Sequence, residues 1–324
     1  MAEGWDTALD EQLSLMHSFN TVEGREYLNG FAISLGRAGR VDANTGQALD
    51  PDPEYAEELV GMATKGLPEC DPFYVSDELT ELIGYAAESF KPEAIELTDM
   101  IVPAGFAYFG KPLYIIDTRG LKMPFRAMQW NVLTNLPGGS RVHVPEDAFH
   151  GIVVTLYSHR ADGDPDDAAH GNYTDQRIGG SDLAMEYVTS LRFGVGVADT
   201  IDDESIRDMH AHIKVFFRLC QQTIAVPHRQ RVARPTWKRA RKSWKDIKEV
   251  VVFTLRRAKN ATGYEGEERD VEWSHRWLVQ GHWRNQPYKD GDGTIYKQIW
   301  IAPYVKGPDD KPLILKRRAF ELVR

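Results

Sequence analysis

The sequence FAYFGKPLYII, residues 106–116, is the stretch that decides the fold prediction. It consists of two short apolar runs, rich in aromatic and β-branched residues, on either side of Gly110-Lys111-Pro112. Short runs of this kind, separated by turn residues, are typical of antiparallel β-strands. Another such run follows at residues 151–157. The sequence therefore predicts a central antiparallel sheet within residues 101–160.

Helical patterns lie on both sides of the predicted sheet. Apolar residues recur every three or four positions from Trp5 to Met16, and Ser76 is placed to cap a helix that carries Leu79 and Leu82. After the sheet, apolar residues at helical spacing from Ile206 to Ile224 predict a helix of about five turns. The predicted class is α+β, with a helical N-terminal portion, a central antiparallel sheet and a basic, β-rich C-terminal module.

Charge is distributed unevenly along the chain. Residues 228–324 hold 23 Lys and Arg against 12 Asp and Glu, a net charge of +11, whereas residues 1–227 have a net charge of −20. This division predicts two domains, an acidic helical and sheet domain over 1–227 and a basic module over 228–324. A basic module indicates a polyanion such as RNA or DNA as its partner. Attraction between the two halves inside one fold is the alternative.

The C-terminal segment predicts a β-hairpin. Residues 273–286 read WSHRWLVQGHWRNQ, residues 294–301 read TIYKQIWI, and Asp290-Gly291 lies between them as a turn signal. Because side chains alternate along a strand, one face of the first strand carries three tryptophans and the other carries a polar row. The tryptophans are Trp273, Trp277 and Trp283, and the polar row is Arg276, Gln280, His282, Arg284 and Gln286.

This hairpin holds the candidate catalytic residues His282, Arg284, Tyr296 and Lys297. Cleavage of RNA without a metal needs a group that transfers protons near neutral pH, which histidine supplies, and cations that bind the phosphate. Arg276, Gln280 and Gln286 are candidate nucleic-acid contacts on the same row. The register of the hairpin decides which side chains share a face. A purely structural hairpin with a tryptophan core is the competing interpretation.

A second candidate interface is the basic run 228–248, which contains nine Lys and Arg. Trp237 and Trp244 lie among these cations, and alternation of cations and aromatic rings suits a surface that follows a nucleic-acid backbone. The predicted contacts are Trp237, Trp244, Arg239, Arg241 and Lys242. The alternative is a solvated basic helix and linker.

The C-terminal pattern also resembles the ending of a group of uncharacterised proteins from actinobacteria and their phages and plasmids. The residues that carry the resemblance are Arg276-Trp277, Val279, Gly281-His282-Trp283-Arg284, Gln286, Ile299-Trp300-Ile301, Pro303-Tyr304, Lys306-Gly307-Pro308 and Pro312-Leu313. Upstream stretches, including Pro103–Phe106 and Arg126–Trp130, are similar to the same group. The resemblance implies an actinobacterial or mobile-element setting and carries no known activity.

Several function classes lack their sequence signals. The chain has no P-loop, no GxGxxG after a strand and no GxSxG motif, and its histidines lack the HExxH spacing. The acidic stretch 162–170 lacks the spacing of a calcium loop, so neither a metal nor a cofactor is predicted. A signal peptide and an apolar run long enough for a membrane span are not evident, which predicts a cytoplasmic protein with no membrane partner.

Two function hypotheses follow. The first is a nucleic-acid-directed protein of an actinophage or actinobacterium, with an endoribonuclease-like toxin as its catalytic form. The second is a regulator or host-takeover factor that acts on a host protein without catalysis. Salt-sensitive binding of RNA or DNA separates the two, because phosphate contacts release counterions. The sequence leaves both the enzyme question and the oligomeric state open.

Overall fold

The computed structural model describes residues 5–37, 40–41, 48–90, 93–116, 122–133, 151–162, 179–194, 204–243, 247, 249–255, 277–279, 281–290, 293–301 and 304–306. The chain divides into two compact units, unit 1 at Met1–Arg256 and unit 2 at Arg257–Arg324. The boundary drawn from charge, between residues 227 and 228, falls inside unit 1 instead, within a strand of its sheet.

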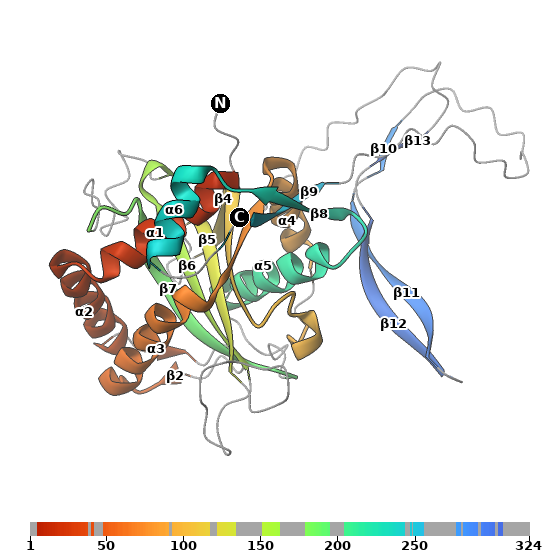
Figure 1. Cartoon of the computed structure of the whole chain (residues 1–324). Helices are drawn as coiled ribbons and strands as arrows, with labels where there is room; N and C mark the ends of the chain where they lie inside the picture. The colour runs from red at the N-terminus through yellow and green to blue at the C-terminus, as the bar shows by residue number, and fades with distance from the viewer. Residues whose placement is uncertain are drawn as a thin grey trace, which may run out of the picture. The chain divides into compact units, whose positions relative to one another are not determined.

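Unit 1 is built on a seven-stranded sheet (Figure 1) with the order β7-β6-β5-β4-β3-β9-β8. The strands are β3 (Asp71–Val75), β4 (Ala104–Ile116), β5 (Lys122–Leu133), β6 (Gly151–His159), β7 (Leu183–Arg192), β8 (Ala225–Arg231) and β9 (Glu249–Leu255). A separate short pair joins β1 (Arg40–Val41) to β2 (Ala48–Leu49).

The sheet is mixed. Strands β4 to β7 form consecutive antiparallel pairs. The pairs among β4, β5 and β6 confirm the antiparallel sheet predicted within residues 101–160, and β7 is an addition that was not predicted. Strand β3 is parallel to both of its neighbours, β4 and β9, and β9 pairs antiparallel with the edge strand β8. The parallel pair β3–β4 is joined through helix α4 (Asp77–Glu88), which is the kind of crossover that parallel strands require. The α+β class is confirmed.

The stretch 106–116 forms one strand where the sequence predicted two. Gly110-Lys111-Pro112 lies inside β4, and the register with β5 shifts between Tyr108 and Leu113. A β-bulge absorbs the extra residues and lets the strand continue. Gly110 is closely surrounded there, because a Cβ atom would lie 2.1 Å from Asp77 Oδ1 and 3.0 Å from Asp77 N.

Helices cover both faces of the sheet (Figure 1). Helix α5 (Glu204–Cys220) packs with α4 on one face, where Phe216 and Phe217 contact the ring of Trp130 at centroid distances of 5.6 and 5.3 Å. The other face is covered by α1 (Trp5–Phe19), α2 (Val22–Arg37), α3 (Pro53–Gly66) and α6 (Arg234–Ser243). Single 3₁₀ turns, η1 (Leu67–Glu69), η2 (Leu97–Asp99) and η3 (Arg160–Asp162), connect these elements.

The predicted helices form with local corrections. The helix at the N-terminus and the cap at Ser76 are confirmed, since Ser76 Oγ accepts a hydrogen bond from Leu79 N at 3.4 Å. The helix predicted up to Ile224 ends at Cys220 instead, and strand β8 begins at Ala225. Pro227 is tolerated within β8 because an edge strand does not need every N–H group.

Unit 2 contains two antiparallel pairs. Strand β10 (Trp277–Val279) pairs with β13 (Tyr304–Lys306), and β11 (His282–Asp290) pairs with β12 (Gly293–Ile301). The continuous strand predicted over 273–286 is therefore wrong, because β10 and β11 belong to different pairs. The hairpin prediction is confirmed for β11–β12, in which Asp290 lies opposite Gly293 across a two-residue loop.

Candidate functional site

The strongest concentration of positive charge lies on β8 and α6 of unit 1. We call it the basic surface and define it as Arg229, Arg231, Arg234, Lys238, Arg239, Arg241 and Lys242, all of which are exposed. Residues 228–256 carry a net charge of +8, whereas unit 2 carries +3. The positive charge that the sequence assigned to the whole C-terminal module therefore lies mostly within unit 1.

Helix α6 is amphipathic, and this fixes the direction of its cations. Thr236 and Ala240 are buried, and half-buried Trp237 packs against the apolar core beneath. The cations at Arg234, Lys238, Arg241 and Lys242 follow i, i+4, i+7 and i+8 spacing. Residues at this spacing share one helix face, so the four side chains form a stripe directed away from the core.

The basic surface is only partly neutralised by carboxylates. Arg239 forms an ion pair with Asp10 of α1, and Arg229 lies 3.8 Å from Glu249 of β9. Within the described part of the chain, no carboxylate is ion-paired to four of its members, which are Arg231, Arg234, Lys238 and Lys242. The surface therefore keeps an excess of positive charge that a polyanion would neutralise.

The residues predicted as nucleic-acid contacts in the basic run 228–248 differ in their exposure. Arg239, Arg241 and Lys242 are exposed, as a phosphate contact requires. Trp237 packs into the core, with Arg241 above its ring at 5.8 Å, so it anchors α6 and does not offer an open ring for a base. Trp244, also predicted as a contact, lies outside the described residues together with Arg276 and Gln280.

The register of the β11–β12 hairpin separates the four candidate catalytic residues. His282 lies opposite Ile301, Arg284 opposite Ile299, and Gln286 opposite Lys297, so His282, Arg284 and Lys297 share a face. Tyr296 lies opposite Pro287 and therefore on the other face. The geometry brings three of the four together and does not place Tyr296 with them.

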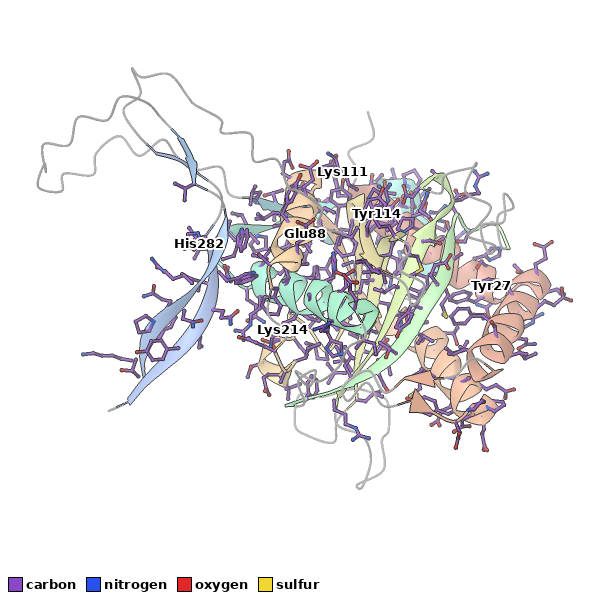
Figure 2. All side chains as sticks on the ribbon, turned by 180° about the vertical axis from the view of Figure 1, so that it is seen from behind. Tyr27, Glu88, Lys111, Tyr114, Lys214 and His282 are labelled. Atoms are coloured by element: carbon purple, nitrogen blue, oxygen red, sulfur yellow. The ribbon has the colours of Figure 1, made fainter. Side chains whose placement is uncertain are left out.

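Both faces of this hairpin are largely exposed. At the end remote from the turn, where Figure 2 labels His282, Trp283 packs edge-on against buried Trp300 at 5.3 Å. Nearer the turn, Tyr296 is 69% exposed, and Lys297 Nζ lies 5.8 Å from the centre of the Tyr288 ring. Arg284 donates a hydrogen bond to Gln286 Oε1 at 2.5 Å. The polar face is thus an open surface suited to contacting a ligand.

A polar cluster at one end of the sheet was not predicted. Arg126 of β5 donates from Nε to Asp162 Oδ2 at 2.7 Å and from Nη1 to Gly110 O at 2.8 Å, and both side chains of the ion pair are largely buried. Burial disfavours the charge of Arg126, but the hydrogen bonds and charge of Asp162 outweigh this effect and raise its pKa. Burial lowers the pKa of nearby His159, against the opposing charge of Asp162.

Comparisons with known proteins leave the family open. No protein-family model matches the sequence, and no curated protein is similar to it. None of the helices in the described part of the chain is both long and apolar enough to span a bilayer. A chain from a crystal structure of AcrVA2 aligns at 12% identity with a TM-score of 0.36, over 77% of this chain and 79% of that chain. This degree of similarity does not establish a common fold, so the chain's own residues must carry the functional proposal.

Proposed function

We propose that the protein binds nucleic acid through the basic surface of β8 and α6. The observation that carries this proposal is the stripe of Arg234, Lys238, Arg241 and Lys242 on a helix whose opposite face is anchored in the core. Because the helix is already formed and packed on the core, its cations are held at fixed spacing before any ligand binds. Fixed cations suit a polyanion, whose phosphates form a regular row of negative charge.

Strand β8 adds two more cations at the edge of the sheet. Arg229 and Arg231 lie opposite Val251 and Glu249, on the sheet face that α5 covers, whereas α6 packs on the other face. Arg229 and Arg231 point to one face of the strand and His228 to the other, and all three are exposed. The carboxylate nearest to Arg229 is at 3.8 Å, a distance at which an exposed ion pair contributes little. These arginines therefore remain free to exchange their weak protein contacts for phosphate oxygens.

The hairpin of unit 2 is proposed as a second nucleic-acid contact, considered by itself. His282, Arg284, Gln286 and Lys297 share its polar face, and this set supplies phosphate-binding cations and a histidine. Cleavage of RNA by His282, with Arg284 and Lys297 as phosphate ligands, is the narrower form of the proposal. Membership of an actinophage or actinobacterial group belongs to the same hypothesis and rests on the sequence resemblance.

The experiment measures binding of a fluorescent single-stranded RNA and a duplex DNA across a range of salt concentrations. The triple variant Arg234→Gln/Lys238→Gln/Lys242→Gln is expected to lower the slope of log K against log salt by roughly 2–3. This value follows from about 0.7 to 0.9 per lost phosphate contact. Arg241 is kept, because it covers the ring of Trp237.

A matched control removes the same charge elsewhere on unit 1. Arg25, Lys65 and Lys122 are exposed and lie on α2, α3 and β5, so their triple replacement by Gln changes the net charge equally. This control is expected to keep nearly the full salt slope. Equal losses in both variants would show a general charge effect. No salt-sensitive binding by the wild type would refute nucleic-acid binding and favour a protein partner.

A further inference from the structure

Three potential metal ligands from distant parts of unit 1 meet beside the buried Arg126–Asp162 pair. Glu11 comes from α1, His159 from the end of β6, and Asp182 from the residue before β7. Their ligand atoms all lie within 4.8 Å of one another, and all three residues are half-buried. Within the described residues, His159 makes no direct hydrogen bond to either carboxylate. The two carboxylates therefore lie near the imidazole without being hydrogen-bonded to it.

Glu11 is held in place through its neighbour on α1. The buried Gln12 side chain donates to Leu67 O at 3.0 Å and to Cys70 O at 3.1 Å. These two hydrogen bonds fix the rotation of α1 about its own axis. Glu11, the residue before Gln12 on the same helix, is therefore presented to the end of the sheet in a fixed direction.

Asp182 is fixed by a turn and by its own backbone. Gly179 and Gly180 have φ values of +55° and +92°, and a Cβ on Gly179 would lie 2.4 Å from Thr21 Oγ1. The turn can therefore approach the end of α1 only because glycine occupies it. Asp182 O then accepts from Arg160 N at 2.9 Å, and its carboxylate accepts from Arg160 Nε at 3.1 Å.

His159 is oriented by packing and by one hydrogen bond. It lies opposite Leu183 in the β6–β7 register, one residue from Asp182. The edge of its ring meets Tyr108 at 6.5 Å with an interplanar angle of 84°. Ala161 N donates to its Nδ1 at 3.1 Å, so Nε2 is the nitrogen left for a ligand.

We infer that Glu11, His159 and Asp182 form a binding site for one divalent first-row cation of the Mn²⁺ type. Two carboxylates and an imidazole combine the oxygen donors that Mn²⁺ favours with the nitrogen donor that first-row ions accept. The two carboxylates also bring negative charge to the ion, although that of Asp182 is shared with Arg160. The site shares no residue with the basic surface, and its test does not depend on nucleic-acid binding.

Coordination of an ion by His159 requires a change of imidazole tautomer, in which no proton is gained or lost. When the ion binds Nε2, the proton of the neutral imidazole moves to Nδ1, and the hydrogen bond from Ala161 N must open. This contact belongs to η3, a single turn, so opening it disturbs only one local hydrogen bond. The Ala161 amide is consequently expected to report on ion binding.

The test uses Mn²⁺ alone and the full-length protein. Wild-type protein is expected to bind one Mn²⁺, seen by calorimetry and by loss of the free-ion signal in electron paramagnetic resonance. Glu11→Gln and Asp182→Asn are each expected to weaken binding by more than about tenfold, since each removes a charged ligand. Absence of saturable binding by the wild type would overturn the inference.

A matched control distinguishes the site from general acidity of the surface. Glu57 on α3 is exposed, so Glu57→Gln removes one charge without touching the site, and it is expected to keep wild-type affinity. His159→Gln, which retains a polar side chain, is expected to lose affinity like the carboxylate variants. If Glu57→Gln weakened binding as much as Glu11→Gln, the inference would fail. Circular dichroism confirms that each variant is folded.

Discussion

Asp99→Asn is expected to lower the free energy of unfolding by about 3–5 kcal/mol, because it leaves a buried cation without its counter-charge. Lys214 of α5, labelled in Figure 2, lies 2.5 Å from Asp99 Oδ2, and the two side chains are 1% and 5% exposed. Burial lowers the pKa of Lys214, and the hydrogen bond that its ammonium group donates to Asp99 opposes this effect. Chemical unfolding in urea measures the change.

A matched control lies in the same network. Arg218 pairs with Glu93 at 3.3 Å, and their side chains are 25% and 32% exposed. Solvent screens such a pair, so Glu93→Gln is expected to cost no more than about 1 kcal/mol. Equal losses for Asp99→Asn and Glu93→Gln would contradict a special role for the buried pair.

Gly105→Ala is expected to cost about 3 kcal/mol, because the new methyl group has no space. A Cβ atom at Gly105 would lie 2.1 Å from Cζ2 of Trp130, far inside contact distance. Trp130 is fully buried and cannot move aside, since its Nε1 donates to Val102 O at 2.9 Å and its ring packs on α5. Overpacking of a rigid site usually costs about 1–3 kcal/mol. The upper end of this range is expected here, because the Trp130 ring is held in place on several sides.

The control for this substitution is another glycine in unit 1. A Cβ atom at Gly61 of α3 would meet nothing within 4 Å. Alanine is favoured over glycine inside a helix by about 0.5–1 kcal/mol, so Gly61→Ala is expected to stabilise the protein. Thermal unfolding should move the two variants in opposite directions. A Gly105→Ala variant as stable as the wild type would show that Trp130 can relocate.

Local patterns predicted the parts of the fold that local contacts determine. The apolar runs around residues 106–116 and 151–157 and the cap at Ser76 depend on neighbours in sequence, and their elements form. The parallel pairing of β3 depends on β9, far along the chain, and no local pattern encodes it. The five residues of β3 also include Pro72, which weakens a strand prediction.

The candidate sites also divide into features that the local sequence predicts and features that depend on contacts between distant residues. The cations of α6 are visible in the sequence as charge, but their direction depends on Trp237 and Ala240 packing inward, which only the fold determines. Glu11, His159 and Asp182 have no ligand spacing in the sequence, because the sheet and α1 bring them together. These residues were not predicted as a site from the sequence, and a polar residue at a strand end, such as His159, is a signal that could have found them.

The position of β3 in the sheet also has a consequence for synthesis on the ribosome. Its neighbour β9 begins at Glu249, about 175 residues after β3 ends at Val75. At roughly 5–20 residues per second, one edge of β3 therefore waits about 10–35 s for its partner strand. During this interval the nascent chain exposes unpaired backbone groups at the middle of its future sheet. We expect unit 1 to complete its fold only after α6 and β9 have left the exit tunnel.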